Sequence, residues 1–132
     1  MQEKDLIMSD EIKTGEISYA DREEFKSSMN EKNRIIIKAA EDKLGRDINL
    51  INIREDAGIA DYFIIISGRN KNHTQAIADE IEDKLAKAGM GPDKVEGLRE
   101  GSWILLDCGD TIVHIFTQKE RDFYDLDQLW SE

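Results

Sequence analysis

The sequence predicts an α/β (α+β) fold, in which helices cover a β-sheet. Runs rich in β-branched residues at 48–53 and 62–66 are typical of strands. Segments 31–44 and 72–88 repeat apolar residues at helical spacing. Residues 103–114 form two apolar runs around a polar tetrad, which is typical of two strands joined by a tight turn.

The first helix is expected over 31–44, where Ile36 and Ala40 share one face. Ser28 is a candidate N-cap and Gly45 a candidate C-cap. The first strand follows at 48–53, and 55–58 is a turn.

The run 62–66 contains five apolar residues in succession, so it is expected to be a strand buried on both faces. The next helix, over 72–88, has Asn72 as its candidate N-cap. Strand, helix and then a strand near Val95 or Trp103 make a crossover unit.

The 103–114 hairpin comes next, with Gly109 supplying a residue that takes positive φ at low cost. The end of the chain is expected to fold as a helical turn at 118–123 and a short helix docked by its apolar residues, Leu126, Leu129 and Trp130.

Charge and composition disfavour several classes of function and of binding site. The formal net charge is -11, and no cluster of Lys and Arg supplies the positive face that phosphate binding needs, so direct reading of nucleic acid is disfavoured. One cysteine allows no intramolecular disulfide, and two histidines with it are too few for a structural zinc site. No apolar run reaches the length of a membrane helix, and no signal peptide is apparent, so the expected location is the cytoplasm.

The chain divides into two parts. Residues 1–30 carry eight acids and four bases without long apolar periodicity, and are expected to be an acidic extension that is partly disordered or helical. Residues 31–132 are expected to form the single folded domain.

Several segments of residues 31–132 together resemble the bacterial ribosomal silencing factor, or Iojap-like, family. The resemblance lies in their order and spacing: Ala60-Asp61-Tyr62-Phe63, Ser67-Gly68, His73, Ala76-Ile77-Ala78-Asp79, Val95-Glu96-Gly97, Trp103 to Asp107, Gly109-Asp110, His114, and Arg121-x-Phe123-Tyr124-x-Leu126-x-x-Leu129-Trp130.

The resemblance implies a mixed sheet flanked by helices, with a nucleotidyltransferase-like outline but without the catalytic carboxylates. It implies a non-enzymatic translation repressor that needs no cofactor or metal. Its expected partner is the large ribosomal subunit, through ribosomal protein fourteen, and its action is to block joining of the small subunit sterically. Crystallised members look like homodimers, so a homodimer is also expected.

The chain departs from the family in three places. Residues 1–30 have no recognised counterpart, and Arg69-Asn70 replaces small hydroxyl residues. Cys108 stands where a larger apolar or aromatic residue is usual, and it would offer a partner a smaller hydrophobic surface.

The expected partner-binding residues lie in the hairpin: Trp103, Leu105, Asp107, Cys108, Gly109 and Asp110. Two readings remain open for Trp103, which is either a core residue or an interface anchor. Asp107 and Asp110 either shape the turn or pair with a basic partner. The C-terminal aromatic and leucine residues, Phe123 among them, are expected to pack the tail, and a secondary contact or dimer surface is the alternative for Tyr124, Leu126, Leu129 and Trp130.

The histidines and the Ser67-Gly68 pair allow a catalytic alternative. His73 is expected to be a polar surface residue or to take part in capping a helix, and His114 to be hydrogen-bonded on the sheet face shared by Ile112 and Phe116. A strand followed by Ser67-Gly68 and a helix N-terminus could hold a phosphate, as in a nucleotide-binding or nucleotidyltransferase-like enzyme. That chemistry needs paired carboxylates on one strand face, which this sequence lacks.

Overall fold

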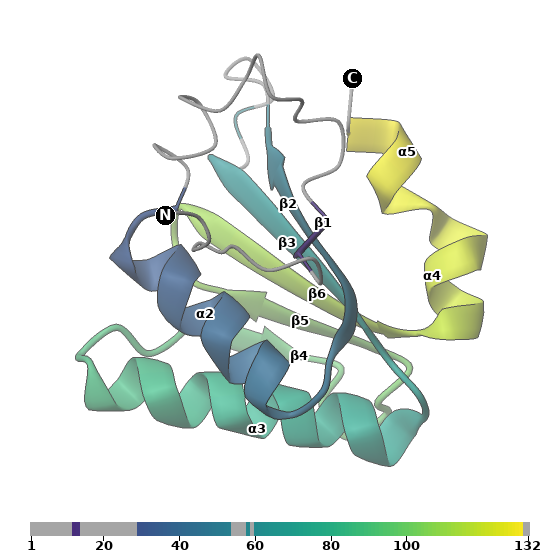
Figure 1. The fold of residues 1–132 in the computed structure, drawn as a ribbon, viewed down its shortest axis with the longest axis horizontal. Helices are drawn as coiled ribbons and strands as arrows, with labels where there is room; N and C mark the ends of the chain where they lie inside the picture. Colours follow the sequence, from purple (N-terminus) through teal and green to yellow (C-terminus); the bar gives the residue numbers. More distant parts are fainter. Residues whose placement is uncertain (1–11, 14–28, 54–57, 59, 131–132) are drawn as a thin grey trace.

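The computed structural model describes residues 12–13, 29–53, 58 and 60–130 (Figure 1). The elements follow in the order β1 (Ile12–Lys13), α2 (Glu31–Asp42), β2 (Arg46–Asn52), β3 (Tyr62–Gly68), α3 (Lys71–Lys87), β4 (Lys94–Glu96), β5 (Trp103–Asp107), β6 (Thr111–Thr117), α4 (Gln118–Tyr124) and α5 (Leu126–Trp130). Among these elements, no helix is long and apolar enough to cross a membrane.

The six strands of the described residues form one mixed sheet in the order β1-β2-β3-β6-β5-β4. β3 and β6 pair in parallel, whereas β2–β3, β5–β6 and β4–β5 are antiparallel. The chain leaves β3, passes through α3 to the far edge at β4, and returns through β5 to place β6 beside β3. The expected fold class, a mixed sheet flanked by helices, is confirmed.

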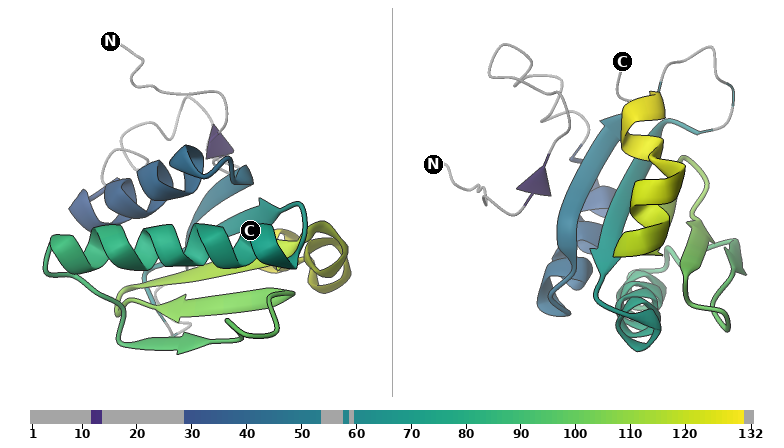
Figure 2. Two further views of the ribbon diagram at one scale, coloured as in Figure 1. Left: turned by 90° about the horizontal axis from the view of Figure 1, so that it is seen from below. Right: turned by 90° about the vertical axis from the view of Figure 1, so that its right-hand side faces the viewer.

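Helices cover the two faces of the sheet unequally (Figure 2). α2 and α3 lie side by side on one face and bury Ile36, Ala40, Ile77 and Ile81 against the sheet. Each fully buried side chain of isoleucine size contributes roughly 2 kcal/mol through removal of apolar area from water. α4 and α5 lie on the opposite face, where α4 contacts β6 and β3 and α5 contacts β2. The strand predicted at 62–66 is indeed buried on both faces.

The helix ends differ from the expected ones by a few residues. The caps are Asn30 and Asn70, whose side-chain oxygens accept hydrogen bonds from backbone N–H groups three residues later. Asn72 lies inside α3, and Ser28 lies outside the described residues.

The residue expected to end α2, Gly45, has another role. Leu44 takes the left-handed conformation instead, with φ of 62°. A Cβ on Gly45 would lie 2.9 Å from a side-chain carbon of Ile66, so this glycine allows the chain to pass close to β3.

The acidic extension contributes to the sheet, which the sequence did not predict. Ile12 and Lys13 form β1 and pair in parallel with Ile48 and Asn49 of β2. A two-residue pairing leaves little hydrophobic pattern to detect in the sequence. The expectation of a partly disordered or helical segment over 1–11 and 14–28, and the turn at 55–57, lie outside the described residues.

Arg121 fastens the C-terminal helices to the sheet. Its guanidinium donates two hydrogen bonds to the Asp127 carboxylate, at 3.1 and 2.6 Å, and two more to Asp47 O and Ser67 Oγ. Asn49 Nδ2 donates to the second Asp127 oxygen at 2.9 Å. Burial opposes ionisation of Asp127, but the hydrogen bonds from Arg121 and Asn49 outweigh it and lower the pKa of that carboxyl. This partly buried ion pair therefore holds α4 and α5 against the sheet.

We expect Arg121→Ala to lower the free energy of unfolding by about 2 kcal/mol, because it leaves the partly buried carboxylate of Asp127 without its main partner. Urea denaturation measures this change. Lys38→Ala serves as the control, since it breaks the exposed ion pair with Asp42 and should change stability by about 0.5 kcal/mol or less. Equal effects of the two substitutions would contradict the role given to Arg121.

Candidate partner-binding surface

The strand β5 presents different residues to the two faces of the sheet. Ile104 and Leu106 are fully buried beneath α2 and α3. Trp103, Leu105 and Asp107 alternate with them and are half-buried on the opposite face. α4 and α5 lie mainly over β2, β3 and β6, so this part of the sheet is incompletely covered (Figure 2). We call Trp103, Leu105 and Asp107 the β5 surface.

Trp103 combines the two roles that the sequence left open. Its ring packs against Phe116 and Tyr124, with centroids 5.0 and 4.5 Å away. Its indole Nε1 donates a hydrogen bond of 3.1 Å to His114 Nδ1. The remaining surface of Trp103 is accessible, so the residue is anchored in the small core of this face and also available for contact.

His114 holds the indole ring of Trp103 by accepting its hydrogen bond. Its side chain is buried, and it shares the face of Ile112 and Phe116 as expected. Because Nδ1 accepts the indole proton, the neutral ring carries its own proton on Nε2, which has no hydrogen-bond partner within the described part of the chain. Burial lowers the pKa of His114 from 6.5 to about 4. The ring is therefore neutral near pH 7 and acts as an acceptor for Trp103.

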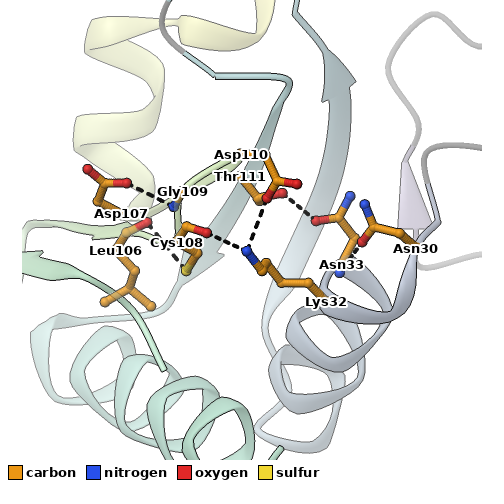
Figure 3. A network of polar contacts seen from close by, with 9 residues as sticks. All are labelled: Asn30, Lys32, Asn33, Leu106, Asp107, Cys108, Gly109, Asp110 and Thr111. Atoms are coloured by element: carbon orange, nitrogen blue, oxygen red, sulfur yellow. Dashed lines mark hydrogen bonds and ion pairs between the residues drawn. The ribbon is translucent and has the colours of Figure 1, made fainter. Parts of the chain in front are cut away.

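The turn between β5 and β6 is held by contacts from three elements. Asp107 Oδ1 accepts a hydrogen bond of 3.0 Å from Gly109 N, and Gly109 has φ of 90°. On the other side of the turn, Lys32 of α2 reaches Cys108 O and Asp110 Oδ1 (Figure 3). The backbone N–H groups of Tyr62, the first residue of β3, and of Asp61 just before it both donate to Asp110 O.

Lys32 and Asn33 support the candidate surface, and the sequence did not reveal either of them. Thr111 Oγ1 donates a buried hydrogen bond of 2.6 Å to Asn33 Oδ1, beside the contacts of Lys32. These partners lie 76 to 78 residues apart in the chain, so no local motif marks them. Asp110 consequently has an intramolecular partner, and Asp107 shapes the turn.

The structure corrects the expectation for Cys108. Its side chain is only 4% exposed and belongs to the core beneath α2 and α3, so it offers a partner no hydrophobic surface. Burial is the main cause that raises the pKa of its thiol from 9.0 to about 11. The residue contributes to this surface only through its backbone, whose carbonyl accepts from Lys32 at 2.6 Å.

The C-terminal helices place aromatic residues beside the β5 surface. Tyr124 contacts Trp103 and is 43% exposed, whereas Leu126 packs on the small core. Phe123, which we expected to pack the tail, is instead 77% exposed. The side chains of Leu129 and Trp130 lie outside the described residues.

The features that suggested a phosphate site have structural roles. Ser67 Oγ accepts a hydrogen bond from Arg121, on the face opposite α3. A Cβ on Gly68 would lie 2.7 Å from a Thr74 side-chain carbon, so this glycine allows β3 and α3 to pack closely. His73 accepts from Arg69 N and donates to Lys43 O, and thus links two loops. Within the described ranges, no group of three or more His, Cys, Asp and Glu side chains is placed to hold a metal ion.

The depressed pKa of His114 predicts a pH dependence of stability. His114 binds a proton near pH 6.5 in the unfolded chain and only near pH 4 in the folded chain. The free energy of unfolding is therefore highest above pH 6.5 and falls as the pH is lowered toward 4. Urea denaturation at pH 7.5 and 4.5 should show wild type losing ~2–3 kcal/mol more than His114→Asn. Asparagine keeps an acceptor for Trp103 but does not titrate. Identical losses in the two proteins would contradict this assignment.

Comparison with known proteins identifies the family. The family described as "Ribosomal silencing factor during starvation" matches residues 26–132. Ribosomal silencing factor RsfS of Bacillus subtilis (strain 168) is 40% identical over 106 residues, which cover 79% of this chain and 90% of that protein.

Two crystal structures resemble the fold. A Chromobacterium violaceum protein gives a TM-score of 0.73 at 32% identity, covering 76% of this chain and 83% of that one. A Bacillus halodurans protein gives 0.64 at 33% identity, covering 74% and 90%. The extent of the family match and the identity to the Bacillus subtilis protein show that this chain belongs to the ribosomal silencing factor family.

Proposed function

We propose that this protein represses translation by binding ribosomal protein fourteen of the large ribosomal subunit and sterically blocking the small subunit. The observation that carries the proposal is the β5 surface. In this member of the family, its side chains are half-exposed and lie beside the aromatic side chains of α4. The proteins that this chain resembles are named for ribosomal silencing, which supports a role on the ribosome.

The chemistry of the β5 surface suits a protein partner. Trp103 and Leu105 supply apolar area, and an aromatic anchor of this kind is typical of binding hot spots. Trp103 is already held by His114 and Tyr124, so little conformational freedom remains to be lost on binding.

The negative charge of the chain favours association with a basic partner. The chain has a net charge of -11, and Asp107 lies on the β5 surface itself. A basic ribosomal protein would be attracted over several ångströms, which raises the association rate and fixes the orientation of docking.

Inhibition by occlusion requires neither turnover nor a cofactor. One bound copy on the large subunit would occupy space that the small subunit needs, and its effect would follow occupancy. The action would take place in the cytoplasm, where bacterial ribosomal subunits join.

A homodimer would use the same surface. Trp103 and Leu105 of the β5 surface, together with the exposed Phe123 and Tyr124, form the apolar area that a second copy could cover. Self-association and ribosome binding would then compete. Mass measured against concentration, with and without large subunits, tests this competition.

We expect Leu105→Ala to weaken binding to purified large subunits about tenfold, or ~1.4 kcal/mol, because part of a leucine's apolar area is no longer buried. The measurement is light scattering on mixing the two subunits after incubation of the large subunit with the protein. Wild type should slow association, and Leu105→Ala should require a higher concentration for the same effect.

Leu44→Ala is the control, since Leu44 is exposed but lies between α2 and β2, outside the β5 surface. It should inhibit as wild type does, and thermal melts should confirm that both variants are folded. Unchanged inhibition by Leu105→Ala would move the contact elsewhere on the protein. Association unaffected by saturating wild type would contradict silencing itself.

A further inference from the structure

We infer that Lys32 is a positioning residue for the docking turn, residues 107–110, and that it sets the charge this turn shows to the partner. The inference rests on the proposed function, because it concerns how the same surface binds. Lys32 lies on α2, on the face of the sheet opposite the β5 surface, so it acts on the partner only through the turn.

The position of Lys32 is itself well defined. It lies in the first turn of α2, which begins at the Asn30 cap. The next residue, Asn33, accepts the buried hydrogen bond from Thr111 at the start of β6. The N-terminal end of α2 is thus fixed to the β5–β6 hairpin, and it places the ammonium group of Lys32 beside the turn of that hairpin.

The contacts of Lys32 constrain the least regular part of the hairpin. Its Nζ donates to Cys108 O at 2.6 Å and to Asp110 Oδ1 at 3.1 Å, so it spans Gly109 (Figure 3). Gly109 has φ of 90°, and glycine reaches many other conformations at little cost. Lys32 thus limits the conformational freedom of the turn before any partner arrives.

Lys32 also divides the two carboxylates of the turn. Asp110 is ion-paired with Lys32, although its side chain is 47% exposed. Asp107 lies on the other side of the turn and on the β5 surface (Figure 3). The turn therefore presents the negative charge of Asp107 to a basic partner, while that of Asp110 is compensated within the chain.

Removal of Lys32 should raise both the association rate and the dissociation rate. The first change strengthens binding and the second weakens it. An uncompensated Asp110 adds one negative charge near the interface, which speeds encounter with a basic partner. A turn that lacks the Lys32 contacts keeps more conformational freedom, part of which is lost on binding, so the complex dissociates faster. A general loss of stability would not raise the association rate, and this separates positioning from a merely structural role.

The test is the kinetics of full-length Lys32→Gln binding to large ribosomal subunits purified from the source organism and immobilised on a biosensor. We expect the association rate at low salt to rise about twofold and the dissociation rate to rise about fivefold. The rise in association rate should disappear at high salt, because screening removes the effect of the added charge.

Lys38→Gln is the matched control. It makes the same change of charge on the same helix and also breaks an ion pair, with Asp42, but it does not contact the turn. It should leave the dissociation rate unchanged. In the double variant Lys32→Gln/Asp110→Asn, the association rate should return to the wild-type value, whereas dissociation should remain fast.

Equal dissociation rates for Lys32→Gln and Lys38→Gln would overturn the inference. Amide hydrogen exchange without ribosomes keeps the test independent of the proposed function. The amides of Asp61 and Tyr62, which donate to Asp110 O, should exchange faster in Lys32→Gln than in Lys38→Gln. If wild type fails to bind large subunits, the proposed function fails, and unchanged exchange at these amides would separately refute the role of Lys32.

Discussion

Burial of the two central strands on both of their faces is the constraint on which the rest of this structure depends. β3 and β6 pair in parallel and most of their residues are buried, so each face of the sheet needs a cover. Two long helices, α2 and α3, cover one face completely enough to bury β5 as well. The short α4 and α5 cover the other face less fully. The half-exposed β5 surface is therefore a result of unequal cover, and the Arg121 contacts hold the smaller cover, α4 and α5, against the sheet.

The same unequal cover explains why polar groups are concentrated on the less covered face. Arg121 and Asn49 donate hydrogen bonds to the Asp127 carboxylate where α4 and α5 cross the sheet, and His114 accepts a hydrogen bond from Trp103 on the same face. Each interaction orders a side chain at the boundary between core and surface. A surface ordered in this way resembles a preformed binding site more than an accidental gap in packing.

The fold was more predictable from the sequence than the site. Periodicity located α2, β3, α3 and the β5–β6 hairpin, because burial imposes a regular pattern on each of them. The helix caps were displaced by a few residues, since several asparagines and serines compete for those positions. Burial of Cys108, exposure of Phe123 and the contacts of Lys32 depend on which elements pack together, and no local pattern contains that information.

The buried thiol makes the native chain its own conformational probe. Cys108 is the single cysteine of the sequence, is nearly inaccessible and remains protonated at neutral pH because burial raises its pKa to about 11. Alkylating reagents and mild oxidants should therefore react only after the hairpin separates from α2. The rate of thiol modification then reports how often the part of the molecule that supports the turn between β5 and β6 opens, without any engineered label.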